Sequence, residues 1–188
     1  MKFVLKLFLC TAVLAALSAK AQVVPDAHEG PFSLYAGGFG SIVQPKYPAQ
    51  DYLYGGGAFA DIKFRKWVQI EAEASWLRMN LPTGSNNSNL VQGAYQDYYS
   101  VGPKVPIHRF GKLETYGKFL ITDTKINYAN GYGYGHFLDY TFGGGADMKI
   151  TRHLRMRVID GEYHYITRYF GSNIQPYGIS VGLAYRVY

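Results

Sequence analysis

Short segments in which apolar and polar residues alternate, separated by turn-forming residues, run through most of this 188-residue chain. The alternation is clearest between positions 67 and 79, where apolar residues such as Ile70 and Trp76 alternate with Glu71 and Glu73. Successive side chains of a β-strand point to opposite faces, so this period of two predicts a strand with one apolar and one polar face. A helix would spread the same apolar residues around its axis. The pattern therefore predicts an all-β chain.

Eight segments of this kind follow one another, and the connections between them alternate in length. The predicted strands cover residues 32–43, 52–64, 67–79, 94–106, 112–125, 137–148, 153–166 and 174–187. The connections after the second, fourth and sixth strands are short and basic, and contain Arg65-Lys66, His108-Arg109 and Arg152-His153. The other connections are longer. Transmembrane barrels have an even strand number, short periplasmic turns and longer external loops. We therefore predict an eight-stranded antiparallel up-and-down transmembrane β-barrel over residues 32–188.

Residues 1–21 have the three parts of a secretory signal. Lys2 and Lys6 give a positive start, an apolar run follows, and Ala19 and Ala21 form an A-x-A cleavage site. The alternative is a membrane anchor, but the apolar run is too short for a transmembrane helix. We expect export, with the cell outer membrane as the destination of a barrel.

Cleavage after residue 21 would remove 21 of 188 residues and leave a mature chain of 167. Residues 22–31 would form a short periplasmic tail before the barrel. Three lysines would leave with the signal, which lowers the formal net charge from +6 to +3. This charge is too small to favour a nucleic-acid partner. The single cysteine, Cys10, would leave as well, so disulfides are not expected.

The polar face of the strands carries charges of both signs. With the apolar face toward lipid, the inward charges are Asp61, Lys63, Glu71, Glu73, Lys104, Glu114, Lys118, Asp139, Asp147, Arg155 and Arg157. Eight strands leave an interior that side chains fill, so these charges predict a lumen salt-bridge network and not a pore. The alternative is a soluble periplasmic lipocalin-like barrel with these charges in water and an apolar ligand inside. Tyrosines near the strand ends favour the membrane.

Asp160, Glu162 and His164 share one face of the seventh strand. This arrangement allows an alternative function, an outer-membrane lipid-modifying enzyme with a site near His164. No positioned nucleophile accompanies it, so a non-enzymatic protein is favoured. Asp160 also falls on the apolar side of the alternation, which predicts a bulge or strand end near Gly161. The histidines lack metal-ligand spacing and no phosphate loop is present, so neither a metal nor a cofactor is predicted.

Several segments resemble a known family. Residues 142–149 and 99–104 look like strands of the outer-membrane protein β-barrel domain family, and the C-terminal strand resembles the signal read by the barrel assembly machinery. The signal would comprise Ser180, Gly182, Tyr185 and Val187. The resemblance implies a small barrel similar to the membrane domain of outer-membrane protein A, with no catalytic residues.

The combined reading predicts a monomer whose partners are outer-membrane lipid and the assembly machinery. Its function would be structural, or an interaction at the cell surface through Tyr/Gly/Asn-rich loops. These predicted loops are 80–92, 126–136 and 167–173.

Overall fold

The computed structural model describes residues 32–46, 52–65, 68–82, 91–128 and 133–188. The predicted signal with Ala19 and Ala21, and the predicted tail at 22–31, lie outside these ranges. No helix among the described residues is long and apolar enough to cross a bilayer.

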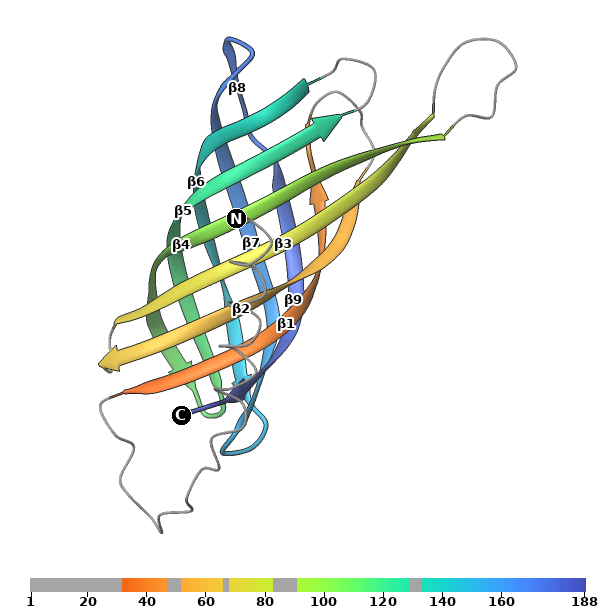
Figure 1. Ribbon diagram of the computed structural model, residues 1–188. Coiled ribbons are helices and arrows are strands. Elements are labelled where there is room, and N and C mark those ends of the chain that lie inside the picture. Colours follow the sequence, from red (N-terminus) through yellow and green to blue (C-terminus); the bar gives the residue numbers. More distant parts are fainter. Residues whose placement is uncertain (1–31, 47–51, 66–67, 83–90, 129–132) are drawn as a thin grey trace, which may run out of the picture. The chain divides into compact units, whose positions relative to one another are not determined.

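The described residues form one antiparallel sheet that closes on itself (Figure 1). Its strands are β1 (Ser33–Gln44), β2 (Leu53–Arg65), β3 (Val68–Pro82), β4 (Val91–Phe110), β5 (Leu113–Tyr128), β6 (Gly133–Lys149), β7 (Leu154–Tyr169), β8 (Ser172–Ile174) and β9 (Tyr177–Arg186). Each strand up to β7 pairs with the next, and β9 pairs with both β7 and β1. The short β8 also pairs with β7. Together, β8 and β9 make one barrel strand, interrupted at Gln175 and Pro176, so the predicted eight-stranded barrel is confirmed.

The two ends of the barrel differ. The short-turn end, as we call it, carries the connections β2–β3, β4–β5 and β6–β7, and the long-loop end carries the other connections. One predicted turn, at 107–111, is wrong, because β4 continues to Phe110 and the chain turns at Gly111 and Lys112. Gly111 takes a φ of 60° there, which glycine adopts without strain. A bulge between Pro106 and His108 accommodates a proline that cannot donate a ladder hydrogen bond.

Strands β3 to β7 are longer than a bilayer requires. A transmembrane strand needs about 9–11 residues, whereas β4 has 20 and β6 has 17. The excess lies mainly at the long-loop end, where β3 and β4 extend farthest (Figure 1). The predicted loops 80–92, 126–136 and 167–173 were therefore too long, since strand pairing continues into each of them.

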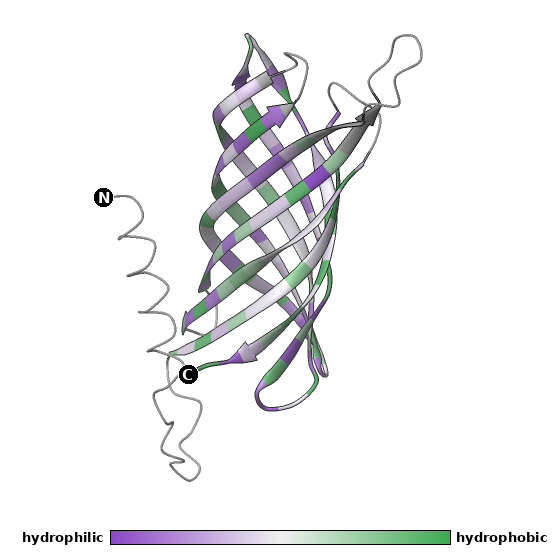
Figure 2. Cartoon of the chain, turned by 45° about the vertical axis from the view of Figure 1, so that its right-hand side comes forward, coloured by the Kyte–Doolittle hydropathy of each residue, from purple (hydrophilic) through white to green (hydrophobic). Residues whose placement is uncertain are grey.

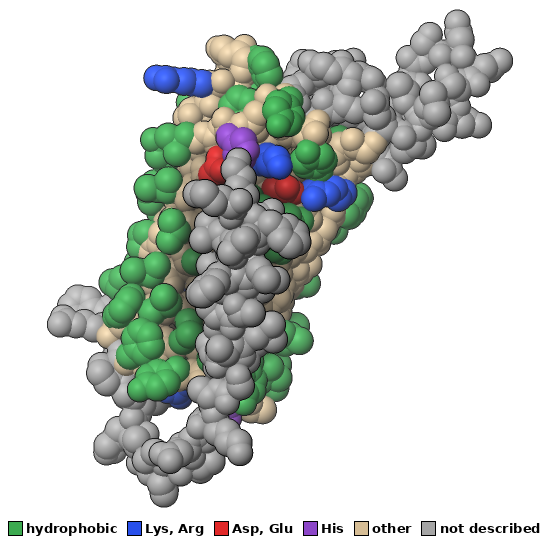
Figure 3. Space-filling model, viewed as in Figure 1, with side chains coloured by type: hydrophobic (Ala, Val, Ile, Leu, Met, Phe, Trp, Pro, Cys, Tyr) green, Lys and Arg blue, Asp and Glu red, His purple; other side chains and the backbone are tan. Residues whose placement is uncertain are grey.

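Over most of the barrel, apolar side chains face outward and charged side chains face inward. The colours of Figure 2 show the corresponding alternation of hydrophobic and hydrophilic residues along the strands. Outward residues such as Ile121 and Leu183 are half exposed, whereas Glu71 and Lys104 are almost completely buried. Figure 3 shows the apolar side chains spread over one face of this wall. The outward aromatic residues lie near both ends, as in the girdles of membrane barrels. They include Tyr52, Tyr54 and Tyr163 toward the long-loop end and Phe64, Phe110, Tyr185 and Tyr188 at the other.

At the long-loop end this polarity is inverted. A buried apolar cluster fills the interior there, and its members are Val43, Leu53, Leu77, Met79, Ala94, Tyr98, Ile126, Ile166 and Tyr169. Several outward side chains of β3 to β6 at the same end are charged, and charged side chains gather on one face in Figure 3. They include Arg78, whose Nη1 lies 2.5 Å from Asp97 Oδ1, and Asp123, whose Oδ2 lies 2.9 Å from His136 Nδ1. This end therefore has the apolar interior and polar exterior of a barrel in water.

Candidate functional site

The centre of the lumen is organised around Lys118, which projects inward from β5. Its Nζ lies 2.9 Å from Glu71 Oε1, 2.5 Å from Asp160 Oδ2 and 2.5 Å from Glu162 Oε1. Glu73 Oε2 lies 3.4 Å away. These carboxylates come from β3 and from β7, so one ammonium group joins strands on different sides of the barrel.

Lys104 on β4 is a second centre. Its Nζ lies 3.0–3.1 Å from oxygens of Glu71, Asp61 and Asp147, and its ammonium is 3.9 Å from the centre of the Tyr116 ring. Lys104 and Lys118 are direct cross-strand neighbours, a pairing that repels in isolation. Because each ammonium is surrounded by carboxylates from other strands, the pairing depends on closure of the barrel.

Two arginines of β7 complete the network. Arg157 donates to Glu71 Oε2 at 2.5 Å and to Glu73 Oε2 at 3.3 Å, and its guanidinium lies 3.8 Å from the centre of the Phe59 ring. Arg155 stacks in the same way over Tyr35, at 4.0 Å. Inward aromatic rings of β1 and β2 thus cover the flat faces of the guanidinium groups, where an aromatic ring attracts a cation.

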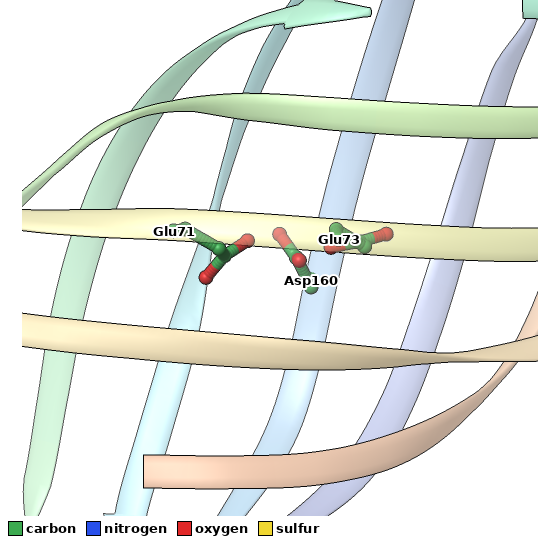
Figure 4. Close-up of side chains that lie close together, drawn as sticks. All are labelled: Glu71, Glu73 and Asp160. Atoms are coloured by element: carbon green, nitrogen blue, oxygen red, sulfur yellow. The ribbon is translucent and has the colours of Figure 1, made fainter. Parts of the chain in front are cut away.

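Glu71, Glu73 and Asp160 place one oxygen each within 4.8 Å of one another (Figure 4). Three carboxylates at this spacing could in principle bind a metal ion. Here, Lys118 contacts all three and Arg157 also contacts all three. The positive charges of Lys118 and Arg157 therefore already neutralise the three carboxylates that would serve as ligands to a metal ion.

The structure brings together eight of the eleven lumen charges expected from the sequence. These are Asp61, Glu71, Glu73, Lys104, Lys118, Asp147, Arg155 and Arg157. The other three lie elsewhere. Asp139 bonds to His164, Glu114 pairs with the exposed Arg109, and Lys63 is half-buried at the short-turn end.

Asp160 and Glu162 belong to the network but were absent from the expected set. A bulge in β7 explains this, because Ala146 pairs with Ile159 while the next residue, Asp147, pairs with Arg157. The extra residue reverses the alternation and turns Asp160 inward. The bulge expected near Gly161 is thus confirmed. Because a bulge reverses the alternation beyond it, the same expectation could have placed Asp160 and Glu162 in the lumen.

A polar layer lies next to the central network, beneath the apolar cluster. His164 Nδ1 lies 2.7 Å from Asp139 Oδ2 and 3.0 Å from Thr141 Oγ1, and its ring stacks on Tyr98. The Thr141 hydroxyl continues through Thr122 to Ser100. The ring of His164 is 2% exposed. This arrangement orients the imidazole but gives a substrate no open approach to it.

Small inward residues make room for the large ones. Gly143 lies opposite Lys118, and a Cβ added there would come within 2.8 Å of Lys118 Cε. At Gly145 an added Cβ would lie 2.2 Å from the carbonyl oxygen of Ile159 and 2.8 Å from the Tyr116 hydroxyl. Glycine at these two positions therefore leaves room in the narrow lumen for the side chains of Lys118 and Tyr116.

The residues of the expected assembly signal lie at the C-terminal strand, which closes the barrel. On β9, Ser180 faces inward and is buried, Gly182 pairs with Phe39 of β1, and Tyr185 faces outward. Val187 follows β9, is exposed, and its backbone bonds to Leu34. Their arrangement fits a strand with one lipid-facing side.

Comparison with solved structures shows the same fold. Neisserial surface protein A matches with a TM-score of 0.58 at 8% identity, over 83% of this chain and 97% of that one. OprG from Pseudomonas aeruginosa gives 0.57 at 12% identity, over 85% and 97% of the two chains. The N-terminal β-barrel domain of OprF, from the same organism, gives 0.55 at 14% identity, over 81% and 96%. At these identities the matches establish the architecture.

No curated protein matches the chain significantly. A family model does, and it spans residues 9–186, nearly the whole sequence. The resemblance expected from the sequence is thereby confirmed. With its closed eight-stranded barrel and charged lumen, the chain belongs to the outer membrane protein beta-barrel domain family.

Proposed function

We propose that this protein is exported to the cell outer membrane and acts there as a non-enzymatic barrel that presents an interaction surface outside the cell. The observation that carries the proposal is the inverted polarity of the long-loop end. Leu77 and Ile126 are completely buried in its interior, while Arg78 and Asp123 are exposed on its wall. Such an end is stable in water, so it extends the barrel beyond lipid as a rigid support for the loops.

The lumen supports a scaffold and not a channel. Lys118 and Arg157 are buried, and each joins carboxylates from two or more strands across the interior. Moving such a side chain aside would leave buried charges without partners, which is costly. The exposed, chemically varied part of the molecule is therefore the long-loop end, where a role in surface interaction would reside.

Assembly is part of the same proposal. Ser180, Gly182, Tyr185 and Val187 would be read by the barrel assembly machinery, and the barrel would then sit in outer-membrane lipid as a monomer. Support comes from the position of β9, which pairs with β7 and β1 and so forms the closing seam. A strand that completes the sheet removes its last open edges.

The proposal is tested by thiol labelling on intact cells. Phe170 lies in the β7–β8 turn at the long-loop end, and Arg152 lies at the short-turn end; both are exposed. In a Cys10→Ser background, a membrane-impermeant maleimide should label Phe170→Cys on intact cells and Arg152→Cys only after permeabilisation. The reverse pattern would reject the orientation, and labelling of neither until the cells are lysed would reject surface display.

A further inference from the structure

A cleft opens at the short-turn end of the lumen, next to the central ion-pair network, with which it shares Asp147 and Arg155. It is small and partly open to solvent, and its lining residues are Arg109, Lys112, Glu114, Asp147, Lys149 and Arg155. They come from the ends of β4, β5, β6 and β7 and from the β4–β5 turn. Four of the six are cations.

The charge around this cleft is unbalanced. Lys63 adds a fifth cation, since it interacts electrostatically with Glu114, Arg109, Lys149 and Arg155. The carboxylates are already engaged, because Glu114 bonds to Arg109 and Asp147 accepts a hydrogen bond from Lys104. An excess of positive charge in a concave, partly buried site attracts anions.

Arg155 supplies an independent indication. This residue is 3% exposed, and its Nη1 finds no hydrogen-bond acceptor among the described residues. The nearest carboxylate oxygens, on Asp147 and Asp61, are 3.6 Å and 3.8 Å away. A buried charged donor without an acceptor is costly, so a group that brings an oxygen to Nη1 would be stabilising.

We propose that this cleft binds a phosphate group. Arginine recognises phosphate through its planar set of donors, and lysines add point charge. Tyr35 holds the guanidinium of Arg155 from one side, so the group is already oriented. Phe64, Phe110 and Tyr188 are exposed at the same end, and aromatic residues of this kind lie at the level of lipid headgroups. The phosphate could thus belong to a lipid headgroup or to a soluble anion.

The test uses the full barrel, refolded in a zwitterionic detergent without phosphate and titrated with inorganic phosphate by isothermal calorimetry. Saturable binding is expected. Lys112→Gln and Lys149→Gln should each weaken it, and Arg155→Lys should weaken it by about tenfold, the equivalent of one charge-assisted hydrogen bond. Arg152→Gln is the matched control, because it removes a cation at the same end but outside the cleft. Boiling-dependent gel mobility verifies that each variant is folded.

The source of the phosphate is separated by repeating the titration in nanodiscs. If phosphatidylglycerol abolishes inorganic phosphate binding and phosphatidylcholine does not, an anionic lipid headgroup occupies the cleft. If binding persists in both, the ligand is soluble. Two results overturn the proposal: no saturable binding in detergent, or equal weakening by Arg152→Gln and Lys112→Gln, which would indicate nonspecific attraction. These results would leave the proposed surface role intact, since that role concerns the opposite end.

Discussion

The carboxylate of Asp160 lies 2.5 Å from the ammonium of Lys118, although regular alternation along β7 would direct Asp160 toward lipid. The bulge between Arg157 and Asp160 turns the aspartate inward. Without it, Asp160 and Glu162 would both face the bilayer, and Lys118 would lose two of its four carboxylate partners. The bulge in β7 therefore determines which acidic side chains reach the lumen.

Replacing Lys118 should be among the most damaging single changes. Lys118→Met removes the cation shared by Glu71, Glu73, Asp160 and Glu162, and leaves buried carboxylates underneutralised. The free energy of unfolding should fall by about 3–5 kcal/mol. Urea unfolding in phospholipid vesicles, followed by tryptophan fluorescence, measures it.

The matched control is Lys112→Met, at an exposed turn position. Its effect on the free energy of unfolding should stay within about 0.5 kcal/mol. If both variants unfold at the same urea concentration as the parent protein, the ion-pair network contributes little to stability, and its description as the central support of the barrel is wrong.

Glycines that face large lumen side chains should not tolerate a methyl group. Gly145→Ala would place Cβ 2.2 Å from the backbone oxygen of Ile159, whereas Gly161→Ala on the neighbouring strand meets nothing closer than 3.7 Å. We expect Gly145→Ala to lower the free energy of unfolding by about 1–3 kcal/mol through overpacking. Gly161→Ala should be near neutral. Comparable losses for the two variants would contradict the assigned faces.

The change in exterior polarity predicts where lipid ends. Ile121 and Lys125 both face outward on β5, four residues apart, with Asp123 between them. In nanodiscs and a Cys10→Ser background, a water-soluble maleimide should react with Lys125→Cys at least about ten times faster than with Ile121→Cys, because the reagent and the thiolate require water. Equal labelling rates for the two variants in nanodiscs would mean that the edge of the lipid does not lie between these positions.

Substitution of His164 distinguishes a structural role of the protein from an enzymatic one. His164→Gln removes charge-assisted bonding to Asp139, and should lower the free energy of unfolding by about 1.5–3 kcal/mol. Lipid A and phospholipid composition of cells that express the variant should match those of the parent strain. A changed lipid profile at an unchanged protein level would favour the lipid-modifying alternative over a scaffold.

Much of the architecture was predictable from alternation alone. Along β3 the period of two identifies Glu71 and Glu73 as lumen residues and Val68 and Ile70 as lipid-facing, because a buried face leaves only one acceptable register. The alternation of short and long connections likewise indicates the strand number. Both signals are local, so a single sequence carries them.

Features that depend on neighbouring strands were not predictable in the same way. Asp160 and Glu162 join the lumen only through a bulge, and a bulge is defined against its partner strands. The inverted long-loop end does leave a trace in β3, where Trp76 faces outward, Leu77 inward and Arg78 outward. Side chains continue to point alternately outward and inward, but beyond Trp76 the inward ones are apolar and the outward ones are charged. This change marks the edge of the lipid band.

The most direct test of the account compares boiled and unboiled protein from an outer-membrane fraction by gel electrophoresis in detergent. A closed barrel with apolar residues outside and paired charges inside resists detergent until heated. We predict that the protein requires detergent for extraction and migrates differently after boiling. Recovery in the soluble periplasm with no mobility shift would contradict the account, because the charged face would then lie in water and the apolar face inside.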